Sequence, residues 1–166
     1  MPKIISSDTP EIEFRKRPVK GVNLFVSESV ITAMTEHAES GYAENKEVMG
    51  LLAGYIFKDD EGMYVRIEDA VTSELEADEV SVRFKKENLE ELFDSIDNCE
   101  GDAVVGWYHS HLGIGCYLSE VDIRTHMGLF GGEIGFAVVI DPSDSTLAVF
   151  SCDDYKPKIV SMIVFN

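Results

Sequence analysis

The stretch Gly106–Asp122, GWYHSHLGIGCYLSEVD, joins three predicted elements of the fold. The apolar run DAVVGWYH, which leads into it, predicts a buried strand. Gly113 and Gly115 indicate a tight loop, because glycine adopts backbone angles that other residues avoid. Ser119, with Asp122 three residues later, forms a capping-box pattern and predicts the start of a helix that runs through LSEVDIRTHMGLF.

Apolar runs separated by turn signals continue on both sides of this stretch. Alternating apolar residues predict strands, and apolar residues three or four apart predict helices. The further predicted strands are GVNLFV, EVMGLLAGYIF in a hairpin with MYVRIEDAVT, EVSVRF, IGFAVVID, TLAVFSC and a final strand KIVSMIVFN. The further predicted helices are ESVITAMTEHAESG, which Ser27 can cap and which ends near Gly41, and the amphipathic segment 85–98. These elements predict an α/β (α+β) fold in which helices flank a mixed central sheet.

The chain of 166 residues has the length of one ordinary domain, and its hydrophobic content of 45% favours a packed core. Residues 1–19 are polar and contain three prolines, which predicts an N-terminal extension, either a tail or an addition at a sheet edge. Residues 20–166 form the predicted domain. No apolar run reaches the roughly 20 residues of a membrane helix, and the N-terminus lacks the apolar core of a signal peptide. Three widely spaced cysteines favour reduced thiols, so we expect a cytoplasmic protein without membrane contact.

The chain is strongly acidic, with a net charge of −17. Such a chain repels phosphate backbones, so nucleic-acid binding is disfavoured. The acidity can attract a basic partner or simply keep the protein soluble, and solubility is the simpler interpretation.

Two histidines and an aspartate in the opening stretch could bind one metal ion. His109 and His111 lie two residues apart on a predicted strand, so their side chains point to the same side. Asp122 lies in the first turn of the following helix, where the helix dipole favours an ionised carboxylate. Two imidazoles and one carboxylate leave a fourth position open to water, as in catalytic zinc sites.

Each of these residues also has a simpler interpretation. Many strand histidines bind nothing, and both Ser119 and Asp122 could serve only as helix caps. His126 lies four residues after Asp122 on the same helix face and could be a ligand in its place. Cys116 could also bind zinc, although a small buried residue is the more ordinary reading. Spacing alone leaves these alternatives open.

A water molecule that attacks a carbonyl also needs a general base, usually a carboxylate. Periodicity cannot choose among 31 acidic residues, but Glu47 stands out because it opens the apolar strand EVMGLLAGY. Alternation places it on the same face as Met49 and Leu51. An acid at this position is either a solvated strand end or a catalytic group.

These polar residues together resemble the signature of the JAMM, or MPN-plus, metalloprotease family. That signature is a glutamate, then H-S-H, seven residues, a serine, two residues and an aspartate. Here the matching residues are Glu47, His109-Ser110-His111, Ser119 and Asp122, with the family's spacing unchanged. The runs EVMGLLAGY, VVGWYHSH and GCYLSEVDIRT look especially like the proteasome-lid deubiquitinase and the signalosome isopeptidase. The resemblance extends from about Gly21 to Asp154 and implies a single MPN-type catalytic domain.

The resemblance implies a role for each matching residue. His109, His111 and Asp122 would hold one Zn²⁺, with a water molecule as the fourth ligand. Glu47 would take the proton of that water and pass it to the leaving amine, while Ser119 would stabilise the oxyanion as well as cap the helix. The reaction would cleave the isopeptide bond between ubiquitin, or a ubiquitin-like protein, and a lysine of a target protein.

The resemblance also suggests where the modifier would bind. In this family the segment after the hairpin holds the C-terminal tail of the modifier, and strand addition suits an extended tail. Here that segment is ELEADEVSVRF, so we expect Val80, Val82 and Phe84 to lie on the tail-binding edge. An ordinary strand within the sheet is the alternative.

The chain departs from the family pattern in two respects. Leu112 stands where the family usually has proline, so the loop loses one fixed φ angle, and we expect a less rigid loop with activity retained. The C-terminal helices of the eukaryotic subunits find no match after KIVSMIVFN, which favours a prokaryotic or archaeal relative and leaves association with a proteasome open. The alternative function is a non-catalytic MPN module that scaffolds a complex, although such modules typically lack ligands that this chain has.

Overall fold

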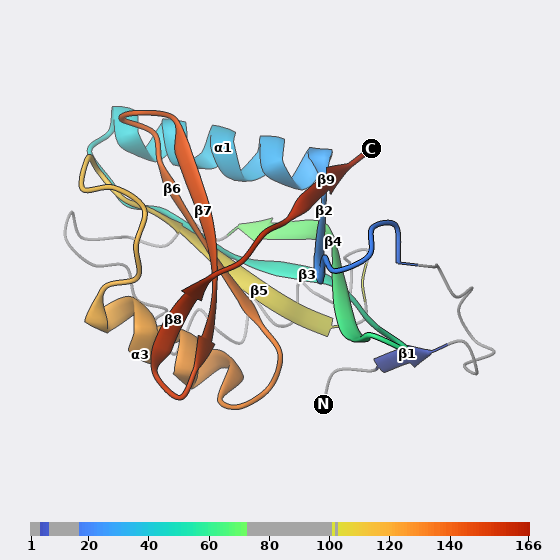
Figure 1. Ribbon diagram of the computed structural model, residues 1–166. Helices are drawn as coiled ribbons and strands as arrows, with labels where there is room; N and C mark the ends of the chain where they lie inside the picture. The colour runs from blue at the N-terminus through green and yellow to red at the C-terminus, as the bar shows by residue number, and fades with distance from the viewer. Residues whose placement is uncertain (1–3, 7–16, 73–100, 102) are drawn as a thin grey trace.

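The computed structural model describes residues 4–6, 17–72, 101 and 103–166 (Figure 1). Its elements in chain order are β1 (Ile4–Ser6), β2 (Leu24–Ser27), α1 (Glu28–Ala43), β3 (Met49–Asp59), β4 (Gly62–Thr72), β5 (Ala103–Ser110), α3 (Glu120–Phe130), β6 (Phe136–Asp141), β7 (Thr146–Asp153), β8 (Lys156–Ile159) and β9 (Ile163–Phe165). The predicted α/β (α+β) class is confirmed, because one mixed sheet carries a helix on each face. The predicted strand EVSVRF and the predicted helix 85–98 lie outside the described residues.

Strands β3, β5 and β6 form the centre of the sheet. β3 pairs antiparallel with both β4 and β5, which confirms the predicted hairpin, and β5 pairs parallel with β6. Every residue of β6 and all of β5 except Val104 are buried. Strands covered on both faces have continuous apolar runs without alternation, which explains the sequences AVVGWY and FAVVI. The strand order is β8-β7-β6-β5-β3-β4-β2-β9, with β1 also paired to β3.

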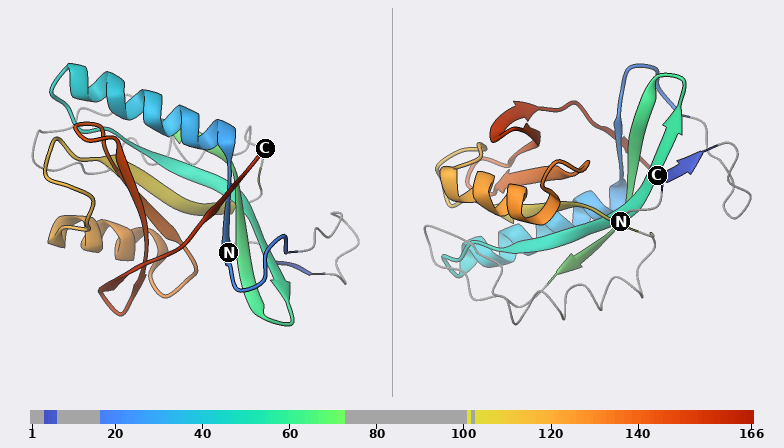
Figure 2. Two further views of the ribbon diagram at one scale, coloured as in Figure 1. Left: turned by 45° about the horizontal axis from the view of Figure 1, so that its top comes forward. Right: turned by 90° about the horizontal axis from the view of Figure 1, so that it is seen from below.

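The two helices cover opposite faces of this sheet, α1 at the top of Figure 1 and α3 at the lower left, and Figure 2 shows the same layers from two further directions. The cluster under α1 includes Val30, Met34, Ala38, Leu52, Val105 and Val138. The cluster under α3 includes Phe130, Met49, Leu51, Trp107 and Val139. His109 follows Trp107 by two residues on β5, so its side chain also lies on the α3 face.

The helix starts agree only in part with the predicted caps. The Oγ of Ser119 accepts the Asp122 N–H at 3.1 Å and Asp122 Oδ2 accepts the Ser119 N–H at 2.9 Å, which is the predicted capping box. Ser27 occupies the predicted N-cap position of α1, but its side chain makes no capping hydrogen bond and its hydroxyl lies 2.9 Å from the Ser29 hydroxyl. α1 ends at Ala43, slightly beyond the predicted Gly41. Within the described residues no helix combines the length and apolar character needed to span a membrane.

The predicted final strand KIVSMIVFN is wrong as a single element. β8 pairs antiparallel with β7 at one edge of the sheet, whereas β9 pairs parallel with β2 at the other edge. The dark red chain in Figure 2 crosses between the two edges. Val160 and Met162, in this crossing, pack against the α1-side core. Because these two residues of the crossing face the core at every second position, the sequence shows the alternation that is typical of a strand.

Part of the predicted N-terminal extension is an addition to the sheet rather than a tail. β1 pairs parallel with Ile56–Lys58 of β3. Further along, the Arg17 guanidinium donates twice to the Asp59 carboxylate, at 2.8 Å each, and lies 4.6 Å from the centre of the Tyr64 ring. The Arg17 side chain is only 4% exposed, so these contacts fix the segment before β2 onto the β3–β4 hairpin.

Candidate metal centre

The fold brings the three predicted metal ligands to one point between the sheet and α3. His109 Nε2 lies 3.0 Å from Asp122 Oδ2 and 3.2 Å from His111 Nε2, and His111 Nε2 lies 3.3 Å from the same carboxylate oxygen. None of the three residues is more than 5% exposed. Their ligand atoms all lie within 4.8 Å of one another, and the described part of the chain contains no second group of this kind. One metal ion could therefore contact all three side chains.

The charge states of His109 and Asp122 suit a metal. Metal binding requires a neutral imidazole and an ionised carboxylate. Burial lowers the pKa of His109 despite the opposing effect of Asp122, which keeps this ring neutral. Burial would raise the pKa of Asp122, but hydrogen bonds from His109, His111 and the Ser119 N–H together hold it well below its usual range. Burial would lower the pKa of His111, but hydrogen bonds to Asp122 and the Gly115 carbonyl raise it, so a metal ion would displace a proton from this ring. Two imidazole nitrogens and a carboxylate oxygen are donors that zinc accepts, so the residues fit the ion that the resemblance implies.

Glu47 reaches this cluster from a different part of the chain. The Ser110 N–H donates to the Val48 carbonyl at 3.0 Å, and the Val48 N–H donates to Ser110 Oγ at 2.8 Å. These bonds continue the antiparallel pairing of β3 and β5 beyond the first residue of β3, so Glu47 lies opposite His111. The sequence predicted that Glu47 opens this strand. β3 instead begins at Met49, so Glu47 precedes it by two residues.

Glu47 is buried and is therefore not a solvated strand end. The residue is 3% exposed. Burial raises the pKa of its carboxyl group to about 7, with His111 lowering it and Asp122 raising it to smaller extents. A carboxyl group with a pKa near neutrality can both accept and release a proton under physiological conditions.

The two alternative ligands point elsewhere. Trp107 Nε1–H donates to His126 Nδ1 at 3.0 Å, and burial lowers the pKa of His126 to about 4. The Trp107 ring in turn stacks on His109, with ring centres 4.6 Å apart. Cys116 Sγ lies 3.3 Å from the hydroxyl of Thr146. His126 therefore contacts the predicted ligand His109 only through the Trp107 ring, and Cys116 contacts a neighbouring turn.

One residue that the sequence did not single out lies beside the ligands. Asp141 is the last residue of β6 and is fully buried. Its carboxylate accepts hydrogen bonds from the backbone N–H groups of Gly113, Gly115 and Ser143 and from the Ser143 hydroxyl. Burial would raise the pKa of Asp141, but these bonds outweigh it and lower that pKa. In the sequence, Asp141 stands at the end of an apolar strand and directly before the turn PSDS. That position indicated only a turn and gave no sign of a contact with the loop 112–118.

The remaining predicted residues have different outcomes. Val80, Val82 and Phe84 lie outside the described residues. Ser119 caps α3, and its role toward an oxyanion stays a prediction.

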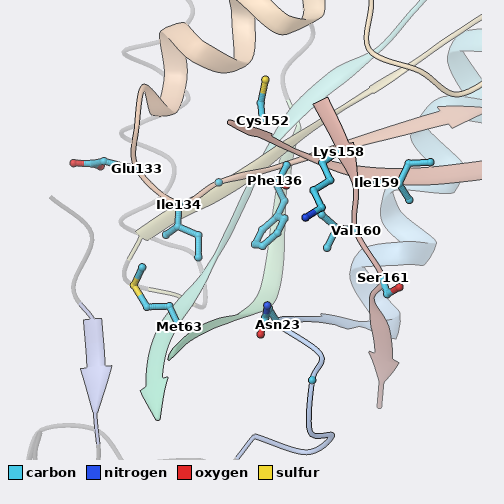
Figure 3. A pocket seen from close by; sticks show the side chains of 13 residues that line it. Asn23, Met63, Glu133, Ile134, Phe136, Cys152, Lys158, Ile159, Val160 and Ser161 are labelled. Atoms are coloured by element: carbon cyan, nitrogen blue, oxygen red, sulfur yellow. The ribbon is translucent and has the colours of Figure 1, made fainter. Parts of the chain in front are cut away.

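A separate hollow of about 440 Å³ lies at the opposite end of β6 from Asp141. Phe136, at the start of β6, faces it together with Met63, and the amino group of Lys158 points into it (Figure 3). The lining also includes Val160 in the crossing between β8 and β9. This hollow shares no residue with the candidate metal centre.

Comparison with known proteins gives the family by a family model and by curated relatives, and adds one solved structure of similar fold. A family model described as "JAB1/Mov34/MPN/PAD-1 ubiquitin protease" matches residues 20–129. COP9 signalosome complex subunit 5 of Gibberella zeae is 34% identical over 93% of this chain and 47% of its own length, and that of Aspergillus fumigatus is 36% identical over 84% and 40%. The chain thus spans about half the length of the curated relatives it matches. The solution structure of protein DSY2949 from Desulfitobacterium hafniense has a TM-score of 0.57 at 18% identity over 86% of this chain and 92% of its own, a likeness of fold alone.

The polar cluster lies within the family match, which includes the segment before β3, all of β5 and all of α3 except its last residue. It covers more than half of the chain, and the fold and the ligand geometry agree with the sequence signature. The chain belongs to the JAB1/Mov34/MPN/PAD-1 ubiquitin protease family.

Proposed function

We propose that this protein is a zinc-dependent isopeptidase that releases ubiquitin or a ubiquitin-like modifier from lysines of target proteins. The convergence of His109, His111 and Asp122 beside the buried carboxyl group of Glu47 carries this proposal. The family description names a ubiquitin protease, which supports the substrate class.

The chain's own residues divide the chemistry between them. Zinc, when bound, supplies a Lewis acid and lowers the pKa of a water molecule. His109 and His111 would present Nε2 and Asp122 a carboxylate oxygen as its ligands. Glu47 would accept a proton from the attacking water and deliver it to the lysine amine as that amine leaves. Ser119 Oγ accepts the Asp122 N–H, which leaves the Ser119 hydroxyl hydrogen available to donate to the oxyanion.

A test of this function separates metal binding from catalysis. We would purify the wild type and Glu47→Gln, measure bound zinc by mass spectrometry, and assay both on lysine-linked diubiquitin and on a ubiquitin-like conjugate. Both proteins should carry one zinc ion, and Glu47→Gln should lower kcat by about 100-fold or more, because an amide cannot accept the proton. Glu44→Gln is the matched control, since the Glu44 side chain is 69% exposed. A wild type without zinc, or equal activity in wild type and Glu47→Gln, would reject the proposal in favour of a non-catalytic scaffold.

Two companion variants test which histidines bind the ion. His111→Asn should lose zinc, because it removes a donor from the cluster. His126→Asn should keep zinc, because His126 Nδ1 accepts the Trp107 N–H instead of facing the cluster. Zinc loss in His126→Asn with retention in His111→Asn would reverse our assignment.

We further propose that the enzyme acts in the cytoplasm as part of a larger assembly, such as a proteasome or a signalosome-like complex. The relatives are named as subunits of the COP9 signalosome complex, which supports an assembly. Cys116 and Cys152, the cysteines within the described residues, form no disulfide, which is compatible with a reducing compartment. Native purification of the tagged chain from its own cells, followed by size-exclusion chromatography, would test for the assembly. Elution as an isolated chain would contradict it.

A further inference from the structure

We infer that Asp141 is a positioning residue, which holds the His111 imidazole in its metal-binding orientation through the backbone of the loop 112–118. This inference rests on the proposed metal site. β5 and β6 run parallel, and the His111 N–H donates to the Ile140 carbonyl at 2.8 Å. That bond places Asp141, the next residue, beside the loop that begins at His111.

The Asp141 carboxylate is built into the loop as a fixed acceptor. Its Oδ2 accepts the Gly115 N–H at 2.8 Å, and both of its oxygens accept the Gly113 N–H, at 3.0 and 3.1 Å. On the other side, the Ser143 hydroxyl donates to Oδ1 at 2.6 Å. A fully buried carboxylate is stable only when it is hydrogen-bonded in this way, and such charge-assisted bonds are stronger than neutral ones.

The two glycines of this loop have flexible backbones, so contacts from outside the loop are needed to hold their conformation. Gly113 and Gly115 have φ angles of +94° and +85°, which glycine adopts readily but which glycine also leaves readily. Asp141 contacts the N–H groups of both glycines, and therefore holds both unusual residues at once.

Gly115 transmits this restraint to the candidate metal ligand. The Gly115 carbonyl accepts the Nδ1–H of His111 at 2.7 Å, and the N–H of the same glycine donates to Asp141. With Nδ1 bonded to the Gly115 carbonyl, Nε2 is the ring nitrogen that faces Asp122 and His109. His109 has a different support, the stacked Trp107 ring. Loss of Asp141 should therefore disturb His111 and leave His109 in place.

The variant that tests this role is Asp141→Asn, which keeps the size of the side chain but replaces one acceptor oxygen by an NH₂ group. That group faces a backbone N–H and cannot bond to it. Asp144→Asn is the matched control, because Asp144 is an exposed aspartate of the same turn, bonded only to the Thr146 hydroxyl among the contacts described. Zinc affinity, measured by competition with a chromophoric chelator, should fall by about 10- to 100-fold in Asp141→Asn and stay unchanged in Asp144→Asn.

A second readout distinguishes positioning from general stability. Long-range ¹H–¹⁵N correlation spectra of the metal-free protein report which imidazole nitrogens carry a proton. His111 Nδ1 should carry a hydrogen-bonded proton in the wild type and Asp144→Asn, and should lose that bond in Asp141→Asn, while the His109 signals stay unchanged. Unchanged zinc affinity, or a His111 Nδ1 proton that stays hydrogen-bonded in Asp141→Asn, would overturn the inference.

Measurements on the wild type cover the case in which Asp141→Asn does not fold. The Gly113 and Gly115 amides should then show slow hydrogen exchange, and His111 should carry its proton on Nδ1. Rapid exchange at both glycines, or a His111 Nδ1 without a proton, would overturn the inference without any variant. If the wild type binds no zinc, the proposed function fails, whereas the tautomer and exchange data still decide the role of Asp141.

Discussion

Acid should destabilise this protein through His126, a histidine that the fold keeps neutral. His126 is 2% exposed, and its Nδ1 accepts the Trp107 Nε1–H, so a proton on Nδ1 would break that bond. Burial lowers the pKa of His126 from 6.5 to about 4. The unfolded chain therefore takes up a proton as the pH falls through 6.5, whereas the folded chain resists it until about pH 4.

The size of this effect follows from the two pKa values. Each pKa unit corresponds to about 1.4 kcal/mol, so a difference of roughly 2.5 units lowers the free energy of unfolding by roughly 3 kcal/mol between neutral pH and about pH 4. Below that range His126 is protonated in both states and contributes no further change. The stabilisation is fully present above pH 6.5, where both states are neutral.

His126→Asn isolates this contribution. The Oδ1 of asparagine takes the place of Nδ1 as acceptor for the Trp107 N–H, and the side chain has no charge at any of these pH values. The variant should be less stable than wild type at about pH 7, because the contact of the His126 ring with Phe130 is lost, and the gap should shrink as the pH falls. Urea unfolding at several pH values, in a chelator so that zinc release does not contribute, measures both curves.

A constant gap between wild type and His126→Asn from about pH 7 to about pH 4 would refute the reasoning. It would mean that the folded and unfolded states bind protons at position 126 equally. A direct NMR titration of His126 with a pKa near 6.5 would lead to the same conclusion.

Three further substitutions probe the stability of the sheet and of the core under α1. Ser110→Ala removes the acceptor of the Val48 N–H, so the free energy of unfolding in urea should fall by about 1–3 kcal/mol with zinc content unchanged; a loss below 0.5 kcal/mol would contradict this. Gly50→Ala would place a methyl group 2.6 Å from the Val71 carbonyl oxygen, inside the β3–β4 pairing, and should cost about 3 kcal/mol, measured in the same way; wild-type stability would show that the strands can separate there. Met34→Ala opens a cavity under α1 at a fully buried position and should lower the free energy of unfolding by about 2–5 kcal/mol, and a smaller loss would mean that the core collapses around it.

Local sequence signals predicted the strand, loop and helix around the site correctly. The alternation of His109 and His111 and the capping pattern of Ser119 depend on residues close together in the chain, where backbone geometry leaves few options. The same local rules could not separate Asp122 from His126, because both lie on one face of α3. Only the position of Trp107 on a different element decides between them.

Other features depend on contacts that a single sequence does not encode locally. Glu47 precedes β3 by two residues, and only the pairing of β3 with β5 brings it to the histidines. Asp141 acts on the loop 112–118 because β6 lies parallel to β5, and parallel neighbours are far apart in the chain. The expectation that Leu112 loosens this loop stays a prediction; the Gly113 and Gly115 N–H groups donate to Asp141.

The crossing from β8 to β9 has a consequence for how the protein matures during synthesis. β2 forms near the start of the domain, yet Phe25 pairs with Ile163, close to the end of the sequence. The outer side of β2 therefore stays unpaired until β9 has been synthesised, and an unpaired strand edge invites association with other chains. Glu47, His111 and Asp141 all emerge earlier than β9. The residues of the candidate metal centre are therefore synthesised before the β2–β9 edge of the sheet can close.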